Sequence, residues 1–122
     1  MKHCLVVDDS EVIRKVARRI LEALSFEIAE AENGEEAMGR CHMRVPDAIL
    51  LDWQMPVMDG LEFMKTVMKV PEVASIPIVM ITASGSEENK NQVRSVNPNL
   101  AGYVVKPYTP NTLIETIKPY LK

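Results

Sequence analysis

Short apolar runs alternate five times with segments of helical periodicity, and this alternation restricts the possible folds more than any other feature of the chain. Most of these runs are continuously apolar, as expected of strands that are covered on both faces. The pattern predicts one parallel sheet with helices on both faces, joined by right-handed crossovers. The predicted strands are Cys4–Val7, Phe26–Ala31, Ala48–Leu51, Ile78–Ile81 and Tyr103–Val105.

Length and charge narrow the class of protein further. A chain of 122 residues fits one domain, 1–122, with a single core. Its 14 basic and 17 acidic residues give a net charge of −3, which argues against non-specific nucleic-acid binding. There is no signal-peptide profile, and no apolar run approaches the roughly 20 residues of a membrane-spanning helix. We therefore expect a cytoplasmic protein without membrane insertion, with Cys4 and Cys41 as core residues.

The first predicted helix carries two distinct surfaces. Ser10 is a suitable N-cap for it. Its apolar residues lie on one stripe that we expect to be buried, namely Val12, Ile13, Val16, Ala17, Ile20, Leu21 and Leu24. Four basic residues lie elsewhere, and we expect a solvated face, with a docking surface for an acidic kinase partner as the alternative. These residues are Arg14, Lys15, Arg18 and Arg19.

Five polar residues fall at or just after the ends of four predicted strands: Asp8, Asp9, Asp52, Thr82 and Lys106. Parallel strands place their carboxyl ends at the same edge of the sheet, where ligands bind in open sheets of this type. The sequence therefore predicts that three carboxylates, one hydroxyl and one ammonium meet there. The alternative is that Asp8 and Asp9 are solvated turn residues and that Asp52 is a helix N-cap.

Three carboxylates in one place need positive charge. Two unit charges about 5 Å apart repel by roughly 3 kcal/mol at an effective dielectric constant near 20. Lys106 offsets part of this repulsion, and a hard divalent ion with oxygen ligands, Mg²⁺, fits the remainder. Such a pocket has the parts for phosphoryl transfer to a carboxylate. No histidine is placed to act as a general base, so we expect a high-energy phosphoryl donor.

Four segments resemble the motifs of response-regulator receiver domains, in order and with matching spacing. They are Val6–Ser10, Asp52–Gly60, Ile81–Ala83 and Gly102–Pro107. The resemblance covers the whole chain and is strongest to stand-alone chemotaxis regulators. It implies a single doubly wound α/β domain, (βα)5, whose parallel five-stranded sheet has the strand order 2-1-3-4-5.

The resemblance also implies roles for the acidic residues. Asp52 would be the phosphoacceptor. Asp9, Asp52 and the backbone carbonyl of Gln54 would bind Mg²⁺, with Asp8 acting through water. Gln54 and Ser84 would tune the lifetime of the phosphorylated state.

A second group of residues would bind the phosphoryl group and respond to it. Lys106, Thr82 and the backbone of Ala83 would contact the phosphoryl oxygens. Thr82 and Tyr103 would form the switch, with Tyr103 turning inward when Thr82 moves. The peptide bond from Lys106 to Pro107 would be cis.

The resemblance implies a switch and not an enzyme, with Mg²⁺-dependent self-phosphorylation and autodephosphorylation. The phosphoryl donor would be a histidine kinase or phosphotransfer protein, and a target protein would bind the face near Tyr103. We expect a monomer that acts in chemotaxis or motility. The alternatives are a phosphate sink or a regulator of another kinase pathway.

Two other functions share this architecture. A metal-dependent phosphatase would need a nucleophile and an acid/base Asp two residues apart, whereas Asp8 and Asp9 are adjacent and Asp52 has no such partner. A flavodoxin-like electron carrier would need a phosphate cradle after the first strand, where Asp8 and Asp9 would repel a phosphate.

Overall fold

The computed structural model describes residues 2–83, 85–98, 100–106 and 108–120. Each of its five strands is followed by at least one helix. The elements are β1 (Lys2–Val7), α1 (Glu11–Glu22), β2 (Phe26–Ala31), α2 (Gly34–Met43), β3 (Ala48–Asp52), α3 (Gly60–Val67), α4 (Pro71–Ala74), β4 (Ile78–Thr82), α5 (Glu87–Val96), β5 (Gly102–Val105), α6 (Pro110–Ile117) and the 3-10 turn η1 (Lys118–Tyr120).

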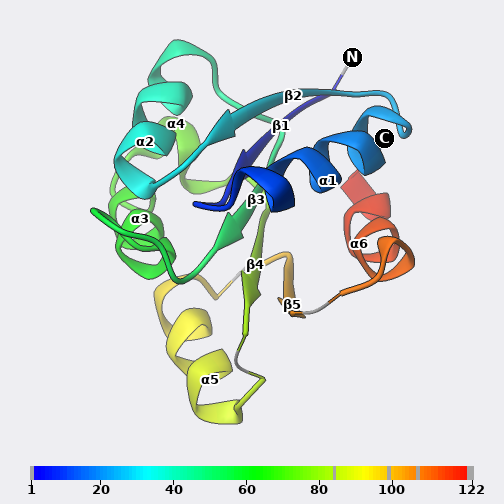
Figure 1. The fold of residues 1–122 in the computed structure, drawn as a ribbon. Helices are drawn as coiled ribbons and strands as arrows, with labels where there is room; N and C mark the ends of the chain where they lie inside the picture. The colour runs from blue at the N-terminus through cyan, green and yellow to red at the C-terminus, as the bar shows by residue number, and fades with distance from the viewer. Residues whose placement is uncertain (1, 84, 99, 107, 121–122) are drawn as a thin grey trace.

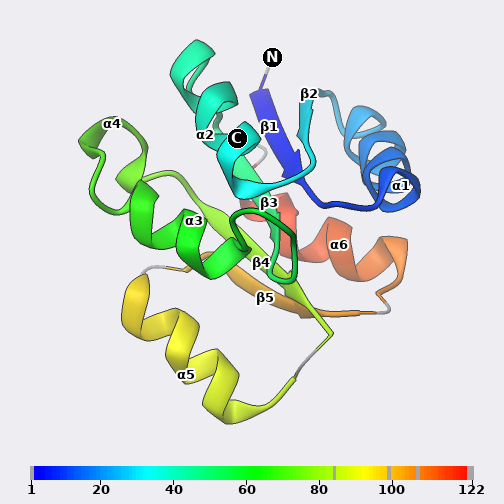
Figure 2. The ribbon, with the colours of Figure 1, turned by 60° about the vertical axis from the view of Figure 1, so that its left-hand side comes forward.

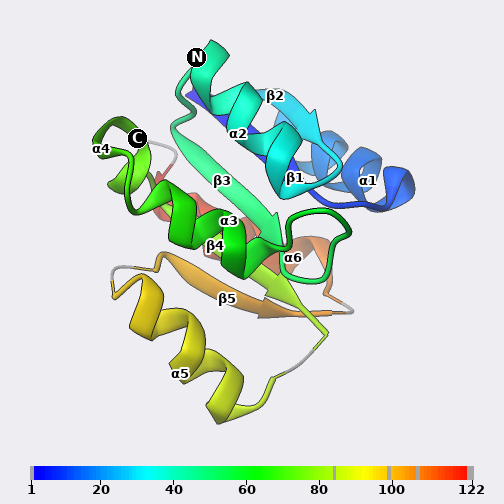
Figure 3. The same ribbon diagram turned by 90° about the vertical axis from the view of Figure 1, so that its left-hand side faces the viewer.

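The strands form one parallel sheet in the order β2-β1-β3-β4-β5, which confirms the expected fold and strand order. The register aligns the strand ends: Val7 pairs with Leu51, and Thr82 pairs with Val105. The residues that follow these pairs therefore lie side by side at the carboxyl edge of the sheet. Figure 3 shows the strands running toward this common edge.

Helices cover both faces of the sheet, as Figures 1 and 2 show. On one face, β1 side chains such as Leu5 pack in a cluster with Phe63 of α3 and Cys41 of α2. On the other face, β1 side chains such as Val6 pack with Leu21 of α1. Successive residues of β1 thus enter opposite cores, which explains why this strand is apolar without interruption.

Helix α1 begins as predicted but buries less of its apolar stripe. The Oγ of Ser10 accepts a hydrogen bond from the backbone N–H of Ile13, so the N-cap is confirmed. Ala17 and Leu21 are buried, but Val12 is 72% exposed and Val16 is 43% exposed. The prediction that the whole stripe is buried is wrong, because α1 presents a narrower face to the sheet than the apolar residues occupy.

Other boundaries differ only slightly from the sequence prediction. Helix α4 was not predicted; it begins at Pro71 and places Val73 in the core. Helix α6 ends at Ile117, two residues before a proline that lacks the N–H needed to continue a helix, and η1 follows it. Cys4 and Cys41 are buried free thiols, as predicted. Among the helices that the structure describes, none has the length and apolar character needed to cross a bilayer.

Candidate functional site

Three carboxylates converge at the carboxyl edge of the sheet. One ligand oxygen from each of Asp8, Asp9 and Asp52 lies within 4.8 Å of the others. Asp8 and Asp52 are 2% and 3% exposed, whereas Asp9 is exposed to solvent. The predicted convergence of these residues is confirmed, and Asp8 is a buried residue, not a solvated turn residue.

Local hydrogen bonds hold Asp8 at the end of β1. Its backbone N–H donates to the carbonyl of Ala31 at 3.0 Å, which continues the pairing with β2 by one residue. Its Oδ1 accepts from the backbone N–H of Ser10 at 2.9 Å, directly before α1 begins. The position of this buried carboxylate is therefore fixed by the turn from β1 into α1.

The end of β3 is fixed by the loop that follows it. The backbone N–H of Gly60 donates to the carbonyl of Trp53 at 2.8 Å. A Cβ at Gly60 would lie 2.4 Å from the carbonyl oxygen of Asp52, so a side chain cannot be placed there without moving the backbone. Asp59 is the N-cap of α3, and its Oδ1 accepts from the N–H of Glu62. The alternative that Asp52 is a helix N-cap is wrong.

Lys106 joins two of the three carboxylates. Its Nζ lies 3.1 Å from Oδ2 of Asp8 and 3.2 Å from Oδ1 of Asp52. Its backbone N–H donates to the carbonyl of Thr82 at 2.8 Å, which ties the residue to β4. Burial alone would lower the pKa of Lys106, but the charges of Asp8 and Asp52 outweigh burial and raise it. The ammonium group is therefore protonated at physiological pH.

One ammonium does not balance this cluster. Burial, followed by the charge of Asp8, raises the pKa of Asp52 to about 6 even though Lys106 opposes the shift. Within the described part of the chain, the carboxylate of Asp9 has no hydrogen-bond or ion-pair partner. Unbalanced negative charge and free carboxylate oxygens are the features that a hard divalent cation requires, so the residues present fit Mg²⁺.

An open cleft of about 510 Å³ lies beside the carboxylates. Asp9 and Gln54 both line it, so a ligand from solvent can reach them. Its other lining residues are Trp53, Met55, Pro56 and Asp59. Trp53 is half-buried against the core.

The two predicted switch residues lie close to the acidic cluster. Thr82 is the last residue of β4 and is fully buried, and its Oγ1 donates to Oε1 of Gln54 at 3.4 Å. Tyr103 is half-buried; burial raises its pKa, and a hydrogen bond with Thr82 acts in the opposite direction. Ala83 follows β4 and is exposed. The predictions for Ser84 and for the peptide bond to Pro107 lie outside the described residues.

Two local features of the site were not predicted. The N-cap role of Asp59 has a sequence signal, because an Asp stands directly before a helical pattern. The Nζ of Lys90 lies 5.7 Å from the centroid of the Tyr103 ring, above its face. This contact between α5 and β5 has no local signal, since it depends on how the helix packs on the sheet.

Comparison with known families agrees with this geometry. The family model described as the response regulator receiver domain matches residues 4–118. This chain belongs to the receiver domain family. Receiver domains are the phosphoryl-accepting modules of response regulators, and they bind Mg²⁺ in an acidic pocket. Membership of this family excludes the flavodoxin-like and phosphatase alternatives.

Two relatives are longer proteins that contain a similar segment. The receiver domain is 37% identical over 121 residues to the phosphate regulon transcriptional regulatory protein PhoB of Pseudomonas aeruginosa, and 35% identical to PhoB of Escherichia coli strain K12. Each match covers 99% of this chain and 52% of the PhoB protein, so the chain spans about half the length of these relatives.

Solved structures of other response regulators superpose closely. The chemotaxis response regulator CheY4 of Vibrio cholerae is 35% identical, with a TM-score of 0.91 and 98% of both chains covered. A receiver domain of a Francisella response regulator is 26% identical, with a TM-score of 0.89, 99% of this chain and 97% of that chain covered.

Proposed function

We propose that this receiver domain is a phosphorylation-controlled binding module in which Asp52 accepts the phosphoryl group. Mg²⁺ would be held by Asp9, Asp52 and the backbone carbonyl of Gln54, with Asp8 acting through water. The observation that carries this proposal is the cluster of three carboxylates within 4.8 Å of one another, to which a single lysine, Lys106, is bound.

Asp52 is the best nucleophile of the three for two reasons. It sits at the end of β3, beside both the ammonium group of Lys106 and the exposed Asp9. Its pKa of about 6 leaves it ionised at neutral pH and makes it more basic than an ordinary carboxylate. Asp8, in contrast, has both carboxylate oxygens engaged, one by the N–H of Ser10 and the other by Lys106.

In the proposed reaction, an oxygen of Asp52 attacks the phosphorus of a phosphohistidine. The phosphorus–nitrogen bond breaks, its electron pair stays on the imidazole, and an acyl phosphate forms on Asp52. Mg²⁺, when bound, neutralises charge on the phosphoryl oxygens. Lys106 would exchange its contact with Asp52, now 3.2 Å, for a contact with one of these oxygens, and the backbone of Ala83 would contact another.

The response would pass through Thr82 and Tyr103. The hydroxyl of Thr82 now interacts with Gln54 and Tyr103, and it would turn toward the phosphoryl group. Tyr103 would then move into the space that Thr82 leaves, and the surface near Tyr103 would change its affinity for a target protein. Gln54 borders the same cleft, which supports a role in tuning the lifetime of the acyl phosphate; we extend this role to Ser84.

The central experiment is a titration that follows Trp53 fluorescence. Mg²⁺ and then beryllofluoride, a phosphoryl mimic, are added to the native protein, to Asp52→Asn and to Asp47→Asn. We expect a saturable fluorescence change in the native protein and in Asp47→Asn. Asp47 is a matched control because its carboxylate accepts from the N–H of His3 and lies outside the acidic cluster. Asp52→Asn should lose the beryllofluoride response. A native protein that does not respond, or an unchanged response in Asp52→Asn, would refute the proposal.

We further propose that residues 1–122 act as one cytoplasmic, monomeric unit whose donor is a histidine kinase or phosphotransfer protein. Motility control is our first choice of output, because CheY4 of Vibrio cholerae matches 98% of this chain. A phosphate sink and control of another kinase are the alternatives. Proteins retained by the beryllofluoride-activated form and not by Asp52→Asn would distinguish these outputs. A retained flagellar component supports motility control, and a retained kinase supports control of another kinase. The absence of any retained target supports the phosphate sink.

A further inference from the structure

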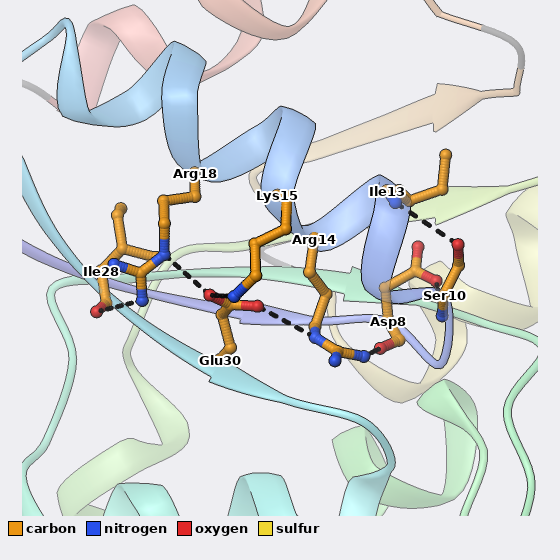
Figure 4. Close-up of polar contacts among 8 residues, drawn as sticks. All are labelled: Asp8, Ser10, Ile13, Arg14, Lys15, Arg18, Ile28 and Glu30. Atoms are coloured by element: carbon orange, nitrogen blue, oxygen red, sulfur yellow. Dashed lines mark hydrogen bonds and ion pairs between the residues drawn. The ribbon is translucent and has the colours of Figure 1, made fainter.

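Three basic residues of α1 bind one carboxylate, Glu30, near the end of β2. The side chain of Glu30 is 12% exposed, and it accepts from Nε of Arg14 at 3.0 Å, from Nζ of Lys15 at 2.8 Å and from Nε of Arg18 at 2.7 Å. Figure 4 shows these contacts, which we call the Glu30 cluster. The expectation of a solvated basic face is wrong for Arg14, whose side chain is 14% exposed, whereas Lys15 and Arg18 remain partly solvated while they bind Glu30. Arg19 is exposed and makes no such contact among the described residues.

The two oxygens of Glu30 serve different partners. Oε1 binds Arg14, whereas Oε2 binds both Lys15 and Arg18. Arg18 also donates from Nη2 to the backbone carbonyl of Ile28 at 3.3 Å. The three cations thus share an anion, but each can be removed without deleting the direct contacts of the other two.

Arg14 differs from its neighbours because it also reaches the acidic site. Its Nη1 donates to the backbone carbonyl of Asp8 at 2.7 Å while its Nε is bound to Glu30. The planar guanidinium group therefore connects β2 to the turn that carries Asp8, as Figure 4 shows. The side chain of Arg14 is 14% exposed, so water competes little for these bonds.

The carbonyl that Arg14 binds belongs to the peptide group between Asp8 and Asp9. The plane of this peptide sets the direction in which the Asp9 side chain leaves the backbone. Asp8 has side-chain contacts of its own, to Ser10 and Lys106, but Asp9 is exposed and depends on its backbone for its position. Among the described residues, the contact with Arg14 is the side-chain bond made to the peptide group that carries Asp9, and it acts together with the backbone bonds of Asp8 and Ser10.

We propose that Arg14, held by Glu30, is a positioning residue that orients Asp9 for Mg²⁺ binding. This inference rests on the magnesium site of the proposed function. Residues that orient metal ligands from outside the coordination sphere commonly change metal affinity by about tenfold or more when they are replaced. The geometry makes Arg14 such a residue, although it touches neither the ion nor the phosphoryl group.

The sign of the effect separates positioning from general electrostatics. Arg14 is a cation close to a cation site, so removing its charge should strengthen Mg²⁺ binding if charge alone matters. If Arg14 orients Asp9, removing it should weaken Mg²⁺ binding despite the more negative charge. The two mechanisms therefore predict opposite changes in the dissociation constant for Mg²⁺.

The experiment compares Arg14→Gln with Lys15→Gln and Arg18→Gln, which change the net charge equally and remove a contact from the same carboxylate. The readout is the Mg²⁺ dissociation constant of the full chain, from Trp53 fluorescence and from calorimetry. We expect Arg14→Gln to weaken Mg²⁺ binding by about tenfold. The other two variants should bind Mg²⁺ as tightly as the native protein or slightly more tightly. Equal weakening in all three, or no weakening in Arg14→Gln, would overturn the inference.

A second pair of variants covers the case in which Arg14→Gln does not fold. Arg14→Lys keeps the charge but cannot hold Glu30 and the carbonyl of Asp8 with one planar group, and Glu30→Gln weakens the hold on Arg14. Both should weaken Mg²⁺ binding, and full affinity in Arg14→Lys would refute positioning. If the native protein does not bind Mg²⁺, the proposed function fails together with this inference. If the native protein binds Mg²⁺ and the Arg14 variants bind it equally well, only this inference fails.

Discussion

The acidic site and the Glu30 cluster are mirror images in charge. The first brings together three carboxylates, two of which bind one ammonium group, and the second places three cations around one carboxylate. A buried carboxylate of the first site nevertheless titrates differently from the carboxylate of the second. The pKa of Asp52 is raised to about 6, whereas hydrogen bonds from Lys15, Arg18 and Arg14 outweigh burial and lower the pKa of Glu30 to about 2.

The difference follows from the neighbours of each carboxylate, because three cations bind Glu30, whereas Asp52 lies beside one ammonium group and the like charge of Asp8. The two clusters also differ in exposure. In the Glu30 cluster, the side chain of Lys15 is 51% exposed and that of Arg18 is 33% exposed, so water screens the excess positive charge. At the acidic site, Asp8 and Asp52 have lost nearly all their water. The excess charge at the acidic site is negative and buried, so a cation would relieve it, whereas the excess charge of the Glu30 cluster is positive and cannot attract a metal ion.

The largest expected effect is stabilisation of the acidic site by Mg²⁺. At a concentration near 100 times the dissociation constant, Mg²⁺ should raise the free energy of unfolding of the native protein by about 2.7 kcal/mol. Urea unfolding with Mg²⁺ and with EDTA measures this difference. Lys15→Gln should gain as much as the native protein, and Asp52→Asn should gain much less. An equal gain in Asp52→Asn would place the ion elsewhere.

Removing one negative charge should stabilise the metal-free protein. We expect Asp52→Asn to raise the free energy of unfolding in EDTA near pH 8 by about 2 kcal/mol, because ionised Asp52 is disfavoured in the folded state. The pKa of Asp52 is raised from 3.8 to about 6, so the native protein loses stability as the pH rises through this window. Urea titrations near pH 8 and below pH 4 test this, and the advantage of the variant should disappear at the lower pH.

Removing the single anion of the Glu30 cluster should have the opposite effect. Glu30→Gln should lower the free energy of unfolding near pH 7 by about 1 kcal/mol, a modest value because two of the cations are partly exposed. The pKa of Glu30 is lowered from 4.5 to about 2, so its contribution is present above pH 4.5 and is lost as the pH falls through this window. Urea unfolding should show the gap between native protein and variant closing below pH 4.5; a constant gap would contradict an ionic origin.

The smallest expected effects come from two residues other than glycine that have a left-handed backbone conformation. Val57, in the loop after β3, has a φ of 67°, and Ser25, which follows α1, has a φ of 70°. This region favours glycine, and β-branched residues tolerate it worst. Val57→Gly should stabilise the protein by about 1 kcal/mol and Ser25→Gly by about 0.5 kcal/mol in thermal or urea unfolding. Destabilisation by either change would show that the native side chain makes a compensating contact.

The sequence was sufficient to predict how the acidic site is assembled. Asp8, Asp52, Thr82 and Lys106 lie at strand ends, and parallel strands bring their ends together whatever the details of packing. The N-cap at Ser10 follows an equally local rule. Each of these predictions depends on one element or on the direction shared by all strands.

The predictions that failed depend on contacts between elements. The exposure of Val12 and Val16 depends on how α1 is rotated on the sheet, which a broad apolar stripe does not determine. The pairing of Arg14, Lys15 and Arg18 with Glu30 joins α1 to β2, and nothing in the spacing of the helix reveals its partner. For the same reason, the contact from Arg14 to the carbonyl of Asp8 is visible only in three dimensions.

The bond from Arg18 to the carbonyl of Ile28 has a consequence for self-association. β2 is an outermost strand of the sheet, and an uncovered outer strand offers hydrogen-bonding groups to which a strand of another molecule can attach. The guanidinium group of Arg18 occupies one such acceptor, and the neighbouring charges would be stripped of water by an incoming strand. These features disfavour edge-to-edge association of the sheet through β2.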